Sequence, residues 1–158
     1  MAKVTLKNQP HRTFGDNVPY GNTTTLAFTL KTNATGAALN SDTTAAIAAG
    51  DVIDLGVLPA GLRLDDASVL VATAMSASVT GSLGFAYDDG VDDATVPQDA
   101  AYFGSGLNIN TAGRVRTSSA KLITLPKPAR LTLTTAGAAN AKASDLTVLV
   151  SGVVVGVL

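Results

Sequence analysis

Bulky apolar residues alternate with small or polar residues along several short stretches of the chain, which is the pattern of half-buried β-strands. In the clearest stretch, residues 79–87, the bulky side chains all fall on one face; they are Val79, Leu83, Phe85 and Tyr87. Successive side chains of a strand point to opposite faces of its sheet, so this face is expected to be buried. Residues 24–31 repeat the pattern, with Leu26, Phe28 and Leu30 predicted to point inward.

The region between residues 51 and 87 is predicted to form the sheet on which the rest of the chain assembles. Its apolar runs at 52–58, 62–74 and 79–87 indicate neighbouring strands of a meander. Pro59-Ala60-Gly61 separates the first two runs, because proline fixes φ and glycine permits a positive φ. Asp65 and Asp66 interrupt the second run and are predicted to form another turn.

Further short strand patterns occur at residues 3–7, 122–125 and 131–134, and the chain closes with an apolar stretch at 146–158. A run that is apolar on both faces, such as residues 153–158, is typical of the middle of a sheet or of a surface under a partner. Residues 42–50 are the single candidate helix, with Ser41 or Asp42 as N-cap and Gly50 beyond the end. Eight to ten short strands predict an all-β, single-domain antiparallel β-sandwich or jelly roll.

Residues 1–22 differ from the rest of the chain, because turn-forming residues dominate after a brief strand pattern. Such a segment cannot bury enough apolar surface to order alone. It nevertheless carries scattered apolar residues, namely Pro10, Phe14, Val18, Pro19 and Tyr20. We therefore predict an extended N-terminal arm over residues 1–22 that lies on a neighbouring subunit, and a β-sandwich domain over residues 23–158.

The composition favours the same fold. All twelve acidic residues are Asp, Glu is absent, and Thr, Val and Gly are abundant, which favours strands over helices. The absence of cysteine excludes disulfides and thiolate metal sites, and it fits folding in a reducing cytoplasm. We find no signal-peptide pattern and no apolar run long enough to span a bilayer, so no membrane partner is expected.

Charge is distributed unevenly along the chain. The formal charge is +3 over residues 1–40, −8 over residues 41–93 and +4 over residues 94–158. Two interpretations remain open at this point. The acidic middle and the basic ends can pair within the fold, or they can form a two-signed surface that docks on a larger assembly by complementarity.

One loop is a candidate site for a hard cation such as Ca²⁺. Carboxylate oxygens are the ligands that such ions prefer. The loop supplies five of them, at Asp88, Asp89, Asp92, Asp93 and Asp99. The spacing is not that of an EF-hand, since Gly90 comes too early and no Glu follows. An acidic turn of this kind also serves solubility alone, so the sequence leaves the presence of a cation open.

No motif indicates catalysis or a cofactor. His11 is the only histidine, and no serine lies in a nucleophile-elbow sequence. Gly104-Ser105-Gly106 begins like a dinucleotide fingerprint, but Ile109 occupies the third glycine position. A glycosidase pair drawn from Asp54, Asp65 and Asp66 is a weaker explanation of these residues than a turn. The sequence therefore predicts a protein that is not an enzyme and has no cofactor.

Basic residues gather in the second half of the chain. They are Arg114, Arg116, Lys121, Lys127 and Arg130. Nucleic-acid sites of this kind interleave aromatic side chains with basic ones, and this region has none. We therefore expect no nucleic-acid partner, and we expect these residues to dock on an acidic protein surface.

Three segments carry a resemblance to a known family. They read GDVIDLGVLPAG at residues 50–61, ASVLV at 67–71 and GSLGF at 81–85. This pattern, which covers about a quarter of the chain, is similar to small structural proteins encoded beside the major capsid proteins of tailed phages. It resembles in particular the jelly-roll cement (head decoration) proteins of short-tailed phages, such as that of a Bordetella phage.

The resemblance implies a virion protein on the outer surface of an expanded icosahedral head. It implies that the major capsid protein is the partner, that neighbouring capsid subunits are bridged, and that the protein self-associates as a dimer or trimer. We predict that the contacts come from the arm and the two basic regions, through Lys3, Lys7, Pro10, Arg12, Phe14, Val18, Tyr20, Arg114, Arg116, Lys127 and Arg130. Two alternatives remain: a tail, baseplate or fibre component, and a non-catalytic carbohydrate-binding β-sandwich. The sequence shows neither the repeats of the first nor the aromatic platforms of the second.

Overall fold

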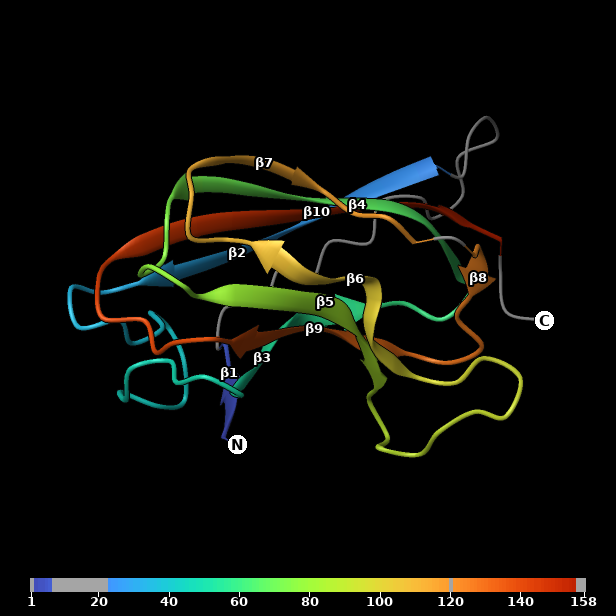
Figure 1. Cartoon of the computed structure of the whole chain (residues 1–158). Coiled ribbons are helices and arrows are strands. Elements are labelled where there is room, and N and C mark those ends of the chain that lie inside the picture. The colour runs from blue at the N-terminus through green and yellow to red at the C-terminus, as the bar shows by residue number, and fades with distance from the viewer. Residues whose placement is uncertain (1, 7–22, 120, 156–158) are drawn as a thin grey trace.

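The computed structural model describes residues 2–6, 23–119 and 121–155, and they form two facing β-sheets (Figure 1). The first sheet has the order β1-β3-β9-β5-β6, and the second has the order β2-β10-β4-β7, with β8 also paired to β4. The strands of the first sheet are β1 (Lys3–Thr5), β3 (Val52–Leu58), β9 (Ala129–Ala136), β5 (Thr80–Tyr87) and β6 (Asp99–Asn108). Those of the second are β2 (Thr23–Thr32), β10 (Ser144–Val154), β4 (Leu62–Thr73), β7 (Gly113–Arg116) and β8 (Ile123–Thr124).

The connectivity is that of a jelly roll. Without the short strands β1 and β8, the sheets are β2-β10-β4-β7 and β3-β9-β5-β6, and β2, β3, β4 and β5 alternate between them along the chain. This double-sheet order is the arrangement of two interlocked Greek keys. All pairings are antiparallel except β1 with β3. The predicted single-domain β-sandwich or jelly roll is confirmed.

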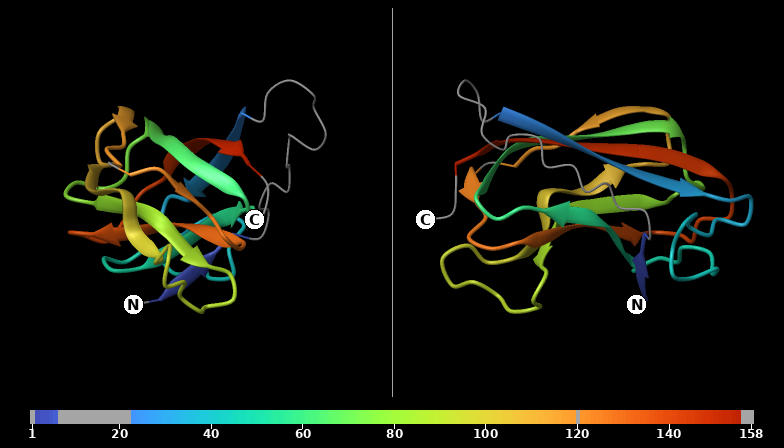
Figure 2. Two further views of the ribbon diagram at one scale, coloured as in Figure 1. Left: turned by 90° about the vertical axis from the view of Figure 1, so that its right-hand side faces the viewer. Right: turned by 180° about the vertical axis from the view of Figure 1, so that it is seen from behind.

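The core fills the space between the two sheets, as Figure 2 shows from the end and from behind. Strand β2 alternates as predicted, with Phe28 and Leu30 buried and Lys31 exposed. In the first sheet, Phe85 of β5 and Leu131 of β9 are also fully buried. Strand β10 lies between β2 and β4, which confirms the expectation of a central position for the apolar C-terminal stretch up to Val154.

The predicted meander is wrong, because residues 52–87 contribute to both sheets. β3 and β5 lie in the first sheet with β9 between them, and β4 lies in the second sheet. The turn at Pro59-Ala60-Gly61 does exist, and Gly61 has the positive φ of 74° that it requires. It carries the chain across the sandwich instead of closing a hairpin. Local pattern identified the strands but not their partners.

The predicted turn at Asp65 and Asp66 is also wrong, because both residues lie inside the continuous strand β4. The register with β10 shifts here: Asp66 pairs with Ser151 and Leu64 pairs with Gly152, so Asp65 is the extra residue of a β-bulge. The bulge changes which residues face the core, from even-numbered positions before it to odd-numbered positions after it. That change of phase in the sequence suggested a break in the strand.

The candidate helix at residues 42–50 is absent, and the described residues contain no helix. This segment is an irregular loop in which Ile47 is buried and its backbone N–H donates to the carbonyl of Gly36. The Ser41 hydroxyl donates to the carbonyls of Ala38 and Thr43 instead of capping a helix. These tertiary contacts outweigh a weak local helix preference. Accordingly, no helix in the described ranges is long and apolar enough to cross a membrane.

Candidate interaction surfaces

The first strand, β1, is held in place by aspartates. The backbone N–H of Ala2 donates to Asp51 Oδ1 at 3.0 Å, and the backbone N–H of Thr5 donates to Asp42 Oδ1 at 3.0 Å. Val4 and Leu6 are buried in the core of the same domain. Residues 2–6 therefore belong to the β-sandwich, which corrects the predicted arm over that part of its length. The other arm residues named above, Lys7, Pro10, Arg12, Phe14, Val18 and Tyr20, lie outside the described residues, as does His11.

A buried carboxylate joins β1 to β9. Asp54 has no exposed side-chain surface, and its Oδ2 lies 3.6 Å from Lys3 Nζ and 3.4 Å from Arg130 Nε. The Arg130 guanidinium also contacts Asp88 Oδ1 at 2.8 Å. The prediction placed Lys3 and Arg130 on separate basic surfaces, but both converge on one acidic residue. For these residues the structure supports pairing of the acidic middle with the basic ends inside the fold.

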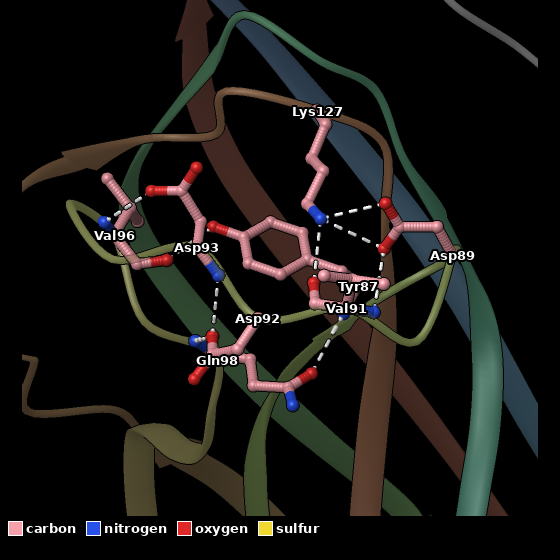
Figure 3. A network of polar contacts seen from close by, with 8 residues as sticks. All are labelled: Tyr87, Asp89, Val91, Asp92, Asp93, Val96, Gln98 and Lys127. Atoms are coloured by element: carbon pink, nitrogen blue, oxygen red, sulfur yellow. Dashed lines mark hydrogen bonds and ion pairs between the residues drawn. The ribbon is translucent and has the colours of Figure 1, made fainter.

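The acidic loop between β5 and β6 is organised by its own carboxylates (Figure 3). Asp93 Oδ1 accepts hydrogen bonds from the backbone N–H groups of Thr95 and Val96, at 2.8 and 3.0 Å. Asp92 Oδ1 accepts one from the backbone N–H of Gln98 at 2.7 Å. The Thr95 hydroxyl, followed by these backbone groups, lowers the pKa of Asp93. The carboxylates are used to fold the loop back on itself.

Lys127 fastens the same loop to the start of β9. Its Nζ donates to Asp89 Oδ2 at 2.8 Å and to the carbonyl of Val91 at 2.7 Å, and it lies 4.5 Å from the centre of the Tyr87 ring. The hydrogen bond from Lys127 is the main cause of the lowered pKa of Asp89. Burial, and then the nearby carboxylates, raise the pKa of Tyr87. Lys127 therefore links the acidic loop to the start of β9 within the domain.

The other chemical candidates are dispersed by the fold. No group of three or more acidic or histidine side chains in the described ranges is arranged to hold a metal ion. Asp54 and Asp65, considered above as a glycosidase pair, belong to strands of opposite sheets. Asp65 accepts two hydrogen bonds from the guanidinium of Arg63, which raise the pKa of that arginine. Gly104, Ser105 and Gly106 lie within β6, so they form no phosphate-binding loop.

Strand β7 presents the basic residues that remain directed outward. Arg114 and Arg116 are exposed on this edge strand, where they pair in register with Leu70 and Ser68 of β4. Arg116 makes a 3.8 Å contact with Asp66, and both side chains are largely exposed. A contact of that kind is weak in water. Arg114 and Arg116 are therefore available to a partner, unlike Lys127 and Arg130, whose side chains are 26% and 25% exposed. Lys3 is 63% exposed beside the buried Asp54.

Three exposed apolar residues belong to segments at one end of the sandwich, which the sequence did not indicate. Val91, Leu122 and Val155 are 61%, 58% and 46% exposed. They come from the acidic loop, the segment before β8 and the end of β10, which lie at the same end in Figures 1 and 2. The apolar pattern identified these residues as hydrophobic but could not show that they are exposed. Leu122, for example, was predicted to lie in a strand. We call this group the apolar end; the term covers these three residues.

Comparison with solved structures identifies the class of fold. A chain from the capsid of Ralstonia phage GP4 aligns with a TM-score of 0.61 at 16% identity, covering 96% of this chain and 97% of that one. A chain from the capsid asymmetric unit of cyanophage Pam1 aligns with a TM-score of 0.59 at 15% identity, covering 90% and 93%. No protein-family model and no curated protein matches the sequence. At these identities the likeness establishes the fold: a jelly-roll domain of the kind present in phage capsid structures.

Proposed function

We propose that this chain is a structural protein of a phage virion that decorates the outer surface of the head and stabilises it by bridging neighbouring capsid subunits. The observation that carries the proposal is the whole-domain likeness to chains of two phage capsid structures, over nearly the full length of both partners. In this role the protein acts by binding alone. Its partners are the major capsid protein and further copies of itself.

Two surfaces support such a role. Arg114 and Arg116 project from an edge strand, and the apolar end includes Val91, which lies on a loop that is already ordered by its own hydrogen bonds. A preordered loop loses little conformational entropy on binding. We take these two surfaces as the footholds through which the protein would contact two subunits at once.

The mechanism that follows is a clamp. A protein that contacts two subunits binds only when their spacing matches its two footholds, so it stabilises the arrangement that it recognises by mass action. A standard interface of about 1,600 Å² would suffice at each site. The second contact forms at a high effective concentration once the first is made. The stabilisation of the shell then accumulates over many equivalent sites.

The test is to mix purified protein with expanded heads that lack it. Occupancy and the temperature at which the heads release DNA are then measured. We expect saturable binding and a higher release temperature. Binding without a higher release temperature would support a protein that decorates the head but would contradict a stabilising role. Binding to tails or to cells, and not to heads, would overturn the proposal.

A further inference from the structure

The free edge of β2 carries a row of outward-pointing backbone groups. β2 pairs with β10 from Thr23 to Thr32 without a shift of register. On the other side, the backbone N–H of Leu39 donates to the carbonyl of Lys31 at 2.8 Å, so the backbone groups of Lys31 point away from β10. This direction alternates along a strand, and the groups of every second residue back to Thr23 therefore point the same way. Within the described ranges, no backbone group pairs with residues 23–29 on this side.

This edge also lacks the features that usually protect an edge strand. Natural proteins block such edges with proline, charged residues or bulges. Residues 23–30 contain no proline and no charged residue, and β2 has no bulge. Lys31, at the end of the row, is engaged by Asp145 at 3.0 Å. The strand contains five threonines and one phenylalanine, residue types that favour sheet formation.

We propose that two copies of this chain pair through β2, antiparallel to each other, about a two-fold axis at Leu26. Among the described residues, the row without a backbone partner runs from Thr23 to Thr29 and is centred on Leu26. In this register Thr23 lies opposite Thr29 of the partner subunit, and Thr25 lies opposite Ala27 of the partner subunit. An axis at Ala27 would instead place Thr23 opposite Lys31 of the partner subunit, where Leu39 already occupies the carbonyl.

The side chains suit this arrangement. Leu26, which is partly buried, meets Leu26 of the partner subunit in a non-hydrogen-bonded pair with a Cα separation of about 4.5 Å. Threonine pairs opposite one another are favourable across strands, and no like charges are brought together. The two second sheets become one continuous sheet across the dimer. The interface is isologous, so it closes at two copies. This inference does not depend on a role in the phage head.

The first test uses the absence of cysteine from the chain. A Leu26→Cys variant has one thiol per chain. In the proposed dimer the Cα atoms of the two cysteine residues are about 4.5 Å apart. This separation lies within the Cα–Cα range of roughly 4.4–6.8 Å that a disulfide spans. Under mild oxidation we expect a reducible covalent dimer. Leu149→Cys is the matched control, because Leu149 is half-buried on β10, away from the edge. Cross-linking of Leu26→Cys no faster than Leu149→Cys would overturn the proposal.

The second test removes one outward N–H. In Ala27→Pro this donor is lost, while the ladder between β2 and β10 is retained because the N–H of residue 27 points away from it. Sedimentation should give a dimer for the unaltered chain and for Ala27→Ser, and a monomer for Ala27→Pro. Circular dichroism checks that each variant keeps its sheet content. A monomeric unaltered chain, or a folded Ala27→Pro variant that remains dimeric, would contradict the two-fold pairing.

Discussion

At the scale of single residues, Asp54 carries the most weight, because it is a fully buried carboxylate facing two cations. Asp54→Asn keeps the shape of the side chain but removes the charge that Lys3 and Arg130 face. We expect the free energy of unfolding to fall by about 1–3 kcal/mol, the usual cost of losing a buried charge-assisted contact. Urea denaturation at neutral pH measures it.

The matched control for this substitution is Asp145→Asn. Asp145 also contacts a lysine, Lys31, but both side chains are partly exposed, at 34% and 55%. Pairs of this kind contribute about 0–1 kcal/mol. Equal losses for the two variants would mean that burial of Asp54 adds nothing to its contribution.

At the scale of elements, β1 is a structural strand. Leu6 is 7% exposed and belongs to the core, so Leu6→Ala should lower the free energy of unfolding by about 2–4 kcal/mol. Leu39→Ala is the control, since Leu39 is 44% exposed and its loss should cost under about 0.5 kcal/mol. Thermal or urea unfolding followed by circular dichroism compares them. If Leu6→Ala were neutral, residues 2–6 would be the start of an arm after all.

The acidic loop should respond to acid through the protonation of Asp89 and Asp93. The pKa values of Asp89 and Asp93 lie below the ordinary value of 3.8 in the folded chain. Their contribution to stability is therefore complete above pH 3.8 and is lost as pH falls through the lower folded-state values. Amide hydrogen exchange at Thr95 and Val96, whose N–H groups donate to Asp93, should accelerate over that range of pH. In Asp93→Asn these two amides should exchange fast already at neutral pH.

Most of the strands could be predicted from the sequence, but β6 and β7 were missed, and the partners of the strands could not be predicted. Alternation at Leu26, Phe28 and Leu30 gave β2 correctly, because one buried face imposes a period of two. The pairing of β3 with β9, some eighty residues later, leaves no local trace. The bulge at Asp65 changed the phase of the pattern and so looked like a turn. Neighbouring segments in sequence were for this reason assigned to one sheet.

The candidate contact residues were predictable as charged or apolar, but their pairing was not. Lys127 and Arg130 look like surface cations in the sequence, and only the fold brings Asp89 and Asp88 within reach of them. Arg114 and Arg116 are exposed on β7, and their contact with a partner stays a prediction. Val91 was overlooked because exposure of an apolar residue depends on the loop that carries it. The type of a side chain can be read from the sequence, but its availability to a partner depends on the fold.

At the scale of the whole molecule, the proposed clamp makes a prediction about charge. Arg114→Glu removes an exposed cation from β7 and places an acid there, so binding to heads should weaken about tenfold, with a reduced dependence on salt. Lys142→Glu makes the same change in net charge at an exposed loop position and should bind normally. Both variants should unfold like the unaltered chain. Equal weakening would show that net charge, and not β7, governs binding.

The central position of β10 in the second sheet affects how fast the chain folds. β2 and β4 do not touch each other in that sheet and are joined only through β10. The hydrogen bond between Thr32 and Ser144 spans 112 residues of sequence. Half of the sandwich must therefore wait for a long loop to close before its contacts form. Chains of such topology fold in roughly milliseconds to seconds. During that interval, two apolar strand edges stand open to other chains, so the yield on refolding should fall as protein concentration rises.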